Sequence, residues 1–348
     1  MENGAWKQVQ QRHEAFWRGE RGVLLEQVTT YQPLRARRGI PLADGQLSSE
    51  GQRIVPDLID PDRFYPTDHK PSSAWQGDFI GGAGPPGLCW TEAILGCPVL
   101  MVTGGAWAGP FEADWTAPDQ LEPDLAWLEK LDAFVDLLVE RATGHYPIVQ
   151  PLLRGPIDMM ASAMGHEEMC LALMEYPDRA DAFLAYCTDL FIHTAKRRLE
   201  HTPPFAGGYA SGYGIWAPGT VVRTQVDNAT MLSPKVYRER VLAHDQRVIE
   251  AFDYPLIHLH SGCLHIVDDL LAVEALKAVQ VSLDFPGGPL ATEVLPILEQ
   301  IVRQKALIVT GPVSTEELHT LEALAQEGSL CLRVALIQDM EDYRPSGN

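Results

Sequence analysis

The sequence predicts an α/β protein built as one (β/α)₈ barrel of the TIM type, a single domain over residues 1–348. Three observations lead to this prediction. Short apolar segments alternate with amphipathic helices over residues 147–337, and this alternation requires a parallel sheet. Roughly eight segments have the length of strands, the number that closes such a barrel. The Gly-rich stretch 79–87 lacks the GxGxxG order of an open, dinucleotide-binding sheet.

Composition excludes several classes of protein. The chain has 348 residues, 46% of them hydrophobic, so it can bury a large core. Its net charge of -20 argues against nucleic acid or an anionic membrane as the main partner. Six cysteines without CxxC spacing, and a start that lacks a signal-peptide pattern, predict a reduced, cytoplasmic protein. No apolar run has the length of a membrane span.

The first part of the chain, residues 1–146, is expected to hold one barrel strand and an irregular N-terminal excursion. Residues 6–18 have the spacing of an amphipathic helix, and the branched residues of 22–31 predict the first strand. Residues 32–109 are rich in Pro and Gly, and their tryptophans need burial, so we expect a long functional loop beside the site. The clearest helix covers 124–143.

The second part carries the strand–helix repeat. Ser233-Pro234 predicts the start of a helix that runs to about residue 252. A capping box from Ser314 to Glu317 predicts another helix start. The strands expected in this part are 147–154, 205–213, 220–226, 256–260, 279–284, 306–310 and 330–334.

Two histidines mark the centre of the expected site. Residues two apart on a strand face the same side, so His258 and His260 point together and Ile257 and Leu259 point the other way. In a parallel barrel the histidines then lie at the carboxyl end of the strand, where such folds place their chemistry. Cys263 follows closely enough to reach the same space.

The histidine pair has three interpretations. It could bind zinc, with Cys263 as a further ligand and Asp227 or Asp284 completing the set. It could donate hydrogen bonds to a substrate carboxylate or phenolate. It could also be structural, with each ring satisfied by the other and by main-chain carbonyls.

Other polar residues stand where strands are expected to end. They are Arg154, Tyr209 or Tyr213, Asp227, Asp284, Thr310 and Arg333. Arg333 is the most informative, because Leu332 and Val334 would face outward and leave the guanidinium inside the barrel. A buried guanidinium needs an anionic partner, either an acidic side chain or a substrate. Cys331 shares that inward face and is expected to be a small core residue.

Several short motifs resemble the uroporphyrinogen decarboxylase superfamily. They are residues 257–262 (IHLHSG), the helix start 232–237 (LSPKVY), the preceding Asp227 and residues 96–98 (GCP). The superfamily includes decarboxylases, zinc-dependent methyltransferases serving corrinoid proteins or coenzyme M and, more distantly, cobalamin-independent methionine synthase. The resemblance covers most of the chain, is strongest over 207–313 and implies a (β/α)₈ barrel with its site at the carboxyl face.

The chain departs from the superfamily patterns at two places. The decarboxylases carry an arginine-rich MRQAGRY segment after the first strand, whereas residues 31–39 here keep arginines without that order. The methyltransferases bind zinc through His-x-Cys and a late Cys. This chain has His258 and His260 at the first two positions and no thiol near Ala335. A site of nitrogen and oxygen ligands would suit an oxygen substrate better than a thiol.

The resemblance favours a methyltransferase that moves a methyl group between a small substrate and a corrinoid on a partner protein. Asp227, His258, His260 and Asp284 are the expected catalytic residues, with zinc held by His258, His260 and Cys263. The expected substrate-binding residues are Arg154, Tyr209, Tyr213 and Arg333. Two alternatives stay open, a cofactor-independent decarboxylase or lyase acting on a carboxylated substrate, and a non-catalytic binding protein. The chain is also compatible with a homodimer.

Overall fold

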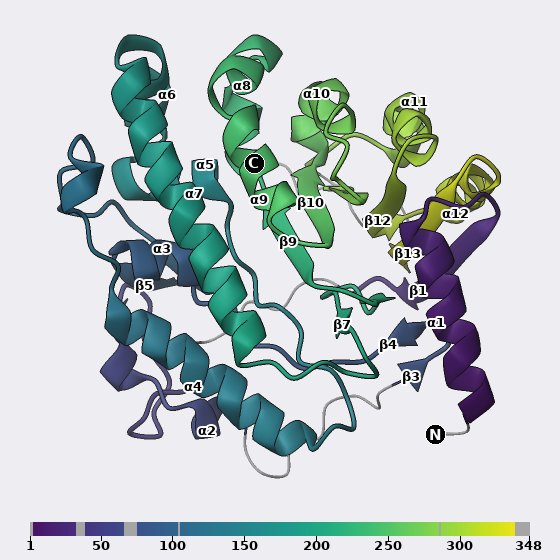
Figure 1. Cartoon of the computed structure of the whole chain (residues 1–348), viewed down its shortest axis with the longest axis horizontal. Helices are drawn as coiled ribbons and strands as arrows, with labels where there is room; N and C mark the ends of the chain where they lie inside the picture. The colour runs from purple at the N-terminus through teal and green to yellow at the C-terminus, as the bar shows by residue number, and fades with distance from the viewer. Residues whose placement is uncertain (1–2, 33–38, 66–74, 104, 285–286, 338–348) are drawn as a thin grey trace.

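A six-stranded parallel sheet forms the centre of the protein (Figure 1). The computed structural model describes residues 3–32, 39–65, 75–103, 105–284 and 287–337. The strand order is β1-β13-β12-β11-β10-β9, so strands consecutive in the chain from β9 to β13 are neighbours and β1 pairs with the last. The bounds are β1 Val23–Thr30, β9 Val221–Gln225, β10 Tyr254–His260, β11 Ala278–Ser282, β12 Ala306–Val313 and β13 Ser329–Leu336.

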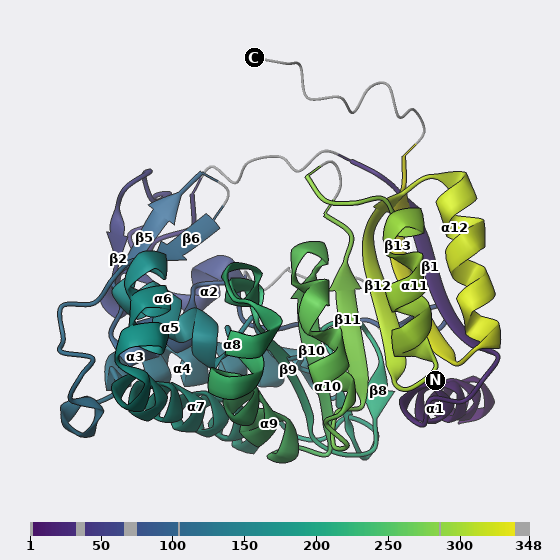
Figure 2. The same cartoon turned by 90° about the horizontal axis from the view of Figure 1, so that it is seen from above.

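Helices connect these strands and cover the outer face of the sheet, as Figure 1 and the view from above in Figure 2 show. They are α8 (Pro234–Arg240) and α9 (Leu242–Glu250) before β10, α10 (Val267–Leu271) before β11, α11 (Ala291–Val302) before β12 and α12 (Thr315–Glu322) before β13. The Ser314–Glu317 capping box at the start of α12 is confirmed. The expected helix over 233–252 is divided at Val241 into α8 and α9.

The two faces of the strands are buried in different cores. Outward residues such as Ile257 and Leu259 belong to the large core shared with the helices. Inward residues near the amino ends, such as Leu256 and Cys331, belong to a smaller inner core with Phe16 of α1 (Asn3–Trp17). The period-two alternation predicted from the sequence is therefore confirmed on β10 and β13.

The remaining elements surround one side of the sheet. The helices are α2 (Pro61–Phe64), α3 (Trp90–Leu95), α4 (Leu125–Ala142), α5 (Pro156–Met164), α6 (His166–Glu175) and α7 (Pro177–Glu200). The strands β2 (Arg53–Ile54), β5 (Val99–Val102) and β6 (Gly105–Ala108) form a small antiparallel sheet. Asp124 caps α4 by accepting from the main-chain N–H groups of Ala126 and Trp127. No helix in the described ranges has the length and hydropathy to cross a bilayer.

Two of the expected barrel strands are wrong. Residues 147–154 contribute a single parallel bridge, between Ile148 and Ala83. Pro147 and Pro151 lack an N–H, which prevents a regular ladder there. Residues 205–213 turn at Gly207, with φ of +81°, and contain only β7 (Tyr209–Ala210), which pairs with β8 (Trp216–Ala217) outside the parallel sheet.

Two irregular segments nevertheless lie beside β9, at that edge of the parallel sheet. The side chain of Gln150 bonds both main-chain groups of Arg223, accepting from its N–H at 2.9 Å and donating to its carbonyl at 2.7 Å. Ala83 in turn accepts from the N–H of Val149 at 2.8 Å. Through these bonds residues 147–150 lie against β9, and residue 83 lies against them. The described residues thus form an α/β fold compatible with the TIM type, without a closed ring of ladder hydrogen bonds.

Candidate metal centre

Three side chains meet at the carboxyl ends of β9 and β10. His258 and His260 project from the inner face of β10, and Asp227 begins the short helical turn that follows β9. One ligand atom from each of the three lies within 4.8 Å of the others. The Nε2 atoms of His258 and His260 are 3.7 Å and 3.8 Å from the two oxygens of Asp227. This group of Asp227, His258 and His260 is called the triad below.

Hydrogen bonds set the direction of both imidazole rings. The Nδ1 of His258 bonds Oε1 of Gln280, and the Nδ1 of His260 bonds Oδ1 of Asp284 at 2.8 Å. Both partners are acceptor oxygens, so the Nδ1 of each ring donates to them and the Nε2 of each ring is left facing the site. Both Nε2 atoms face Asp227. Outer oxygen partners of this kind orient the histidines that bind metals in other proteins.

Burial controls the charge states in the triad. Desolvation, assisted by Arg223, lowers the pKa of His258 to about 3, so its imidazole is neutral as a metal ligand must be. Burial and the nearby Asp158 raise the pKa of Asp227 to about 6. The Oδ1 atom of Asp227 is buried without a hydrogen-bond partner among the described residues. A cation between the three side chains would satisfy that oxygen.

Asp284 supports the triad as a partner of His260. Its second oxygen accepts from the main-chain N–H of Ser261 at 2.9 Å and from the Ser261 hydroxyl at 2.8 Å. Burial by itself would raise the pKa of Asp284, but the hydrogen bonds from His260 and Ser261 outweigh it and lower that pKa. The carboxylate therefore stays ionised and holds the ring of His260.

A fully buried carboxylate on α5 holds the turn that carries Asp227. Asp158 accepts from Nε2 of Gln225 and the N–H of Asp227, each at 3.2 Å. Its other oxygen accepts from the N–H and the side-chain amide of Asn228 at 2.9 Å and 2.8 Å. These four bonds fix the position of the turn that carries Asp227. Asp158 was missed in the sequence because it lies near the start of a helix, 69 residues before Asp227.

Apart from Tyr213, the polar residues that connect to His258 were not expected from the sequence. The Tyr213 hydroxyl donates to Oε1 of Gln280 at 2.5 Å and accepts from Nε of Arg223 at 3.1 Å. Arg223 further donates to Gln225 at 2.8 Å. Alternation along 220–226 could have placed Arg223 and Gln225 on the inner face, and Gln280 stands opposite His258 in the register.

Cys263 lies outside the group of side chains that could share a metal ion. Its thiol is buried and donates to the main-chain carbonyls of Val226 and Asp227, each at 3.5 Å. Burial raises the pKa of Cys263 to about 12, so the thiol is protonated. Among the described residues, Asp227 is the side chain grouped with the two histidines in the cluster that could hold a metal ion.

The expected substrate-binding residues lie in different environments. Arg154 has its Nε 3.2 Å from Glu92 and its guanidinium 5.1 Å from the ring centre of Trp107. Tyr209 packs between the inner and outer cores on the β7–β8 hairpin. Tyr213 and Arg333 line a cavity of about 710 Å³ at the carboxyl ends of β1, β12 and β13, called the mouth cavity below.

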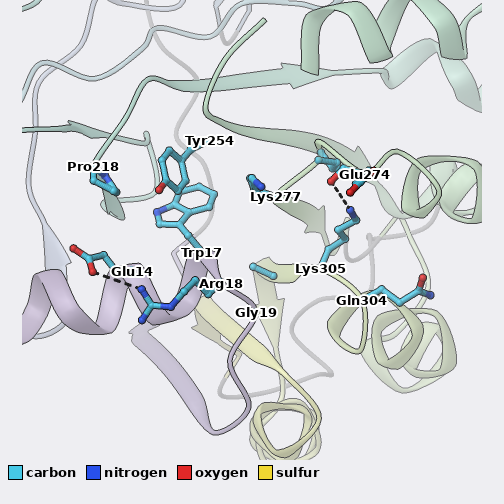
Figure 3. A pocket seen from close by; sticks show the side chains of 12 residues that line it. Glu14, Trp17, Arg18, Gly19, Pro218, Tyr254, Glu274, Lys277, Gln304 and Lys305 are labelled. Carbon is cyan, nitrogen blue, oxygen red and sulfur yellow. Dashed lines mark hydrogen bonds and ion pairs between the residues drawn. The ribbon is translucent and has the colours of Figure 1, made fainter. Parts of the chain in front are cut away.

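A second cavity, of about 570 Å³, lies at the opposite, amino ends of the strands and is called the floor cavity (Figure 3). It is lined by residues that include Trp17, Arg18, Tyr254, Lys277 and Lys305. Arg18 is paired with Glu14 and Glu20, and Lys305 donates to the carbonyls of Val273 and Glu274 at 2.9 Å and 3.2 Å. Most of its positive charge is therefore engaged within the protein.

Comparison with known proteins supports the fold. No protein-family model and no curated protein sequence matches the chain. Among solved structures, the chain is similar to a methyltransferase from Methanosarcina mazei. The two are 14% identical, the match covers 73% of this chain and 74% of that chain, and the TM-score is 0.51. At this identity the likeness extends to the fold alone.

Proposed function

We propose that the protein is a metal-dependent methyltransferase of the uroporphyrinogen decarboxylase superfamily, with its metal held by Asp227, His258 and His260. The observation that carries the proposal is the shared direction of the two Nε2 atoms toward one carboxylate, while each Nδ1 bonds an outer oxygen. The superfamily resemblance and the fold of the methyltransferase neighbour agree with it.

Zinc is the metal that this proposal favours. Two neutral imidazoles and one carboxylate are a ligand set that zinc uses, and three protein ligands leave a position for substrate, as in catalytic zinc sites. Asp284 and Gln280 would orient the two imidazoles, as outer partners do in such sites. We further propose that residues 79–84 and 147–154 fill the two remaining positions of an eight-stranded barrel around this site.

The proposed reaction removes a methyl group from an ether oxygen. The bond between the methyl carbon and the oxygen breaks, its electron pair stays with the oxygen, and the methyl carbon bonds to the acceptor. The superfamily resemblance suggests a corrinoid on a partner protein as that acceptor. A zinc ion at the triad would act as a Lewis acid on the ether oxygen. In this proposal the triad residues position the reacting oxygen, Asp284 orients His260, and Tyr213 bonds the Gln280 oxygen that orients His258.

A decarboxylase is the second candidate, because the raised pKa of Asp227 suits a carboxyl group that delivers a proton. Arg154 and Arg333 would then hold the substrate carboxylates. In that mechanism the protein needs no metal and produces carbon dioxide instead of a methylated acceptor.

A methyl-transfer assay separates these functions. Zinc-loaded protein is incubated with small aryl methyl ethers and free cob(I)alamin, and methylcobalamin is followed by its absorbance. We expect methylcobalamin to form with the wild type and to fall at least 100-fold with His258→Ala/His260→Ala. Carbon dioxide release from carboxylates without metal would favour the decarboxylase. Neither product over the whole panel, with zinc bound, would favour a binding protein.

A further inference from the structure

The mouth cavity contains one charged side chain among the described residues that line it, that of Arg333. The other lining groups are uncharged and include Gln27, Thr310 and Tyr213. Its volume of about 710 Å³ lies within the range of small-molecule sites, about 300–1,000 Å³. A permanent positive charge therefore faces a space of ligand size.

No carboxylate within the described part of the chain pairs with Arg333. Its Nε and Nη2 both donate to one neutral oxygen, Oε1 of Gln27, at 3.1 Å and 2.8 Å. Its guanidinium lies 5.2 Å from the ring centre of Phe79. One hydrogen on Nη2 and both on Nη1 remain, so one edge of the guanidinium still offers two parallel donors. A buried or half-buried guanidinium with such an open edge is suited to a planar anion.

The mouth cavity and the triad share a wall. Thr310 and Tyr213, which line the cavity, each bond the side-chain amide of Gln280, at 2.8 Å and 2.5 Å. The same amide oxygen orients His258. Arg333 stands on β13 and His258 on β10, three strands apart, roughly 14 Å along the wall. The described lining of the mouth cavity holds none of the triad residues, so a molecule that contacts both Arg333 and the triad must extend past Gln280 along this wall.

We propose that the substrate is a small monocarboxylate with a methylated oxygen at its other end, and that Arg333 binds its carboxylate through the open edge. This inference rests on the proposed function for the methyl group, but the carboxylate site itself does not require the metal. A planar carboxylate matches the two parallel donors of a single guanidinium. A phosphate group, with more charge, would require further cations that the described lining does not supply.

Binding measurements test the proposal without turnover. The probes are 4-methoxybenzoate, its neutral amide 4-methoxybenzamide and 4-methoxyphenylphosphonate, titrated calorimetrically into the protein as purified. We expect the carboxylate to bind about 100-fold more tightly than the amide, since a bidentate charged pair is lost. The phosphonate should bind less tightly than the carboxylate. Equal binding of acid and amide, or a preference for the phosphonate, would overturn the proposal.

Variants of single residues test whether Arg333 is the residue that binds the carboxylate. Arg333→Ala should weaken 4-methoxybenzoate about 100-fold and leave the amide unchanged, and Arg333→Lys should recover less than tenfold because an ammonium lacks the planar fork. The matched control Arg18→Ala, in the floor cavity, should bind as the wild type does. His258→Ala/His260→Ala should still bind the carboxylate, so a failure of the metal proposal is distinguishable. Unchanged binding by a folded Arg333→Ala would show that Arg333 serves structure alone.

Discussion

The two ends of the same parallel sheet differ in what their inward side chains do. Near the amino ends, β10, β11, β12 and β13 place Leu256, Ala278, Ala306 and Cys331 inward, in an apolar core. Further along the same strands, the inward residues are His258, Gln280, Thr310 and Arg333, joined by hydrogen bonds or open to the mouth cavity. Each strand thus changes from apolar to polar as it approaches its carboxyl end.

At the amino ends of the strands, α1 and β8 cover the interior of the sheet. Trp17 of α1 donates to the carbonyl of Trp216 on β8 at 2.9 Å, and Trp17 packs against Tyr254. At the floor cavity Arg18 is paired with Glu14 and Glu20, whereas the side-chain partner of Arg333 in the mouth cavity is the neutral Gln27. Our proposed function expects this difference, with stability at the amino end and binding and chemistry at the carboxyl end, as in barrel enzymes.

The largest effect expected at the floor is on stability, through His13. Its Nδ1 accepts from the N–H of Trp216 at 3.0 Å, and its Nε2–H donates to the carbonyl of Asp78 at 2.6 Å. Burial lowers its pKa from 6.5 to about 4. The folded state therefore keeps His13 neutral, and its contribution to stability is present above pH 6.5 and lost as pH falls toward 4.

This loss should be on the order of 3 kcal/mol in the free energy of unfolding. Urea unfolding of the wild type and His13→Gln at several pH values measures it. His13→Gln should be less stable at pH 7 and should lose less stability on acidification. If the unfolding free energies of the two proteins change in parallel with pH, His13 does not contribute to the pH dependence. The proposed methyl-transfer activity of the refolded proteins at pH 7 should be unaffected.

At the mouth, Asp158→Asn should weaken metal binding about 10–100-fold, as loss of an outer partner does. An amide cannot accept all four hydrogen bonds that hold Gln225, Asp227 and Asn228. Competition with a zinc chelator measures the affinity. The control is Asp253→Asn at the amino end, where that carboxylate holds Thr220 by similar bonds of 2.9 Å and 2.8 Å. Equal affinities for the two variants would contradict a positioning role for Asp158.

The smallest effect is expected from Lys277→Ala in the floor cavity. Metal affinity and 4-methoxybenzoate binding should change less than twofold, because the cavity lies at the opposite end of the strands. A tenfold loss of 4-methoxybenzoate binding would move the anion site from the mouth to the floor. The same titrations used for Arg333 provide the measurement.

Part of the fold and of the candidate site follows from local sequence patterns. Alternation within a strand has a fixed period, so the shared face of His258 and His260 and the inward direction of Arg333 could be predicted. The capping box of α12 is also local, since its two residues are three apart. Asp227 could be proposed from its place after a strand, and the structure brings it to the histidines.

Other features depend on contacts between distant segments. Gln280 and Asp158 act through strand register and helix packing, and single-sequence patterns do not specify these. The expected strand 147–154 is wrong. The segment is apolar, as strands are, but its two prolines cannot donate ladder hydrogen bonds. The glycines in 205–213 permitted a hairpin in place of a sheet strand. The parallel α/β fold was therefore predictable from the sequence, but the irregular segments beside β9 were not.

The most direct test of the metal centre is a zinc K-edge X-ray absorption spectrum of the purified, zinc-loaded protein. We expect one zinc per chain with nitrogen and oxygen ligands at about 2.0–2.2 Å and the multiple scattering of two imidazoles. The imidazole signal should disappear in His258→Ala/His260→Ala. A sulfur shell at about 2.3 Å would instead place Cys263 or another thiol on the metal. Such a shell, or zinc bound unchanged in the double variant, would contradict the triad of Asp227, His258 and His260.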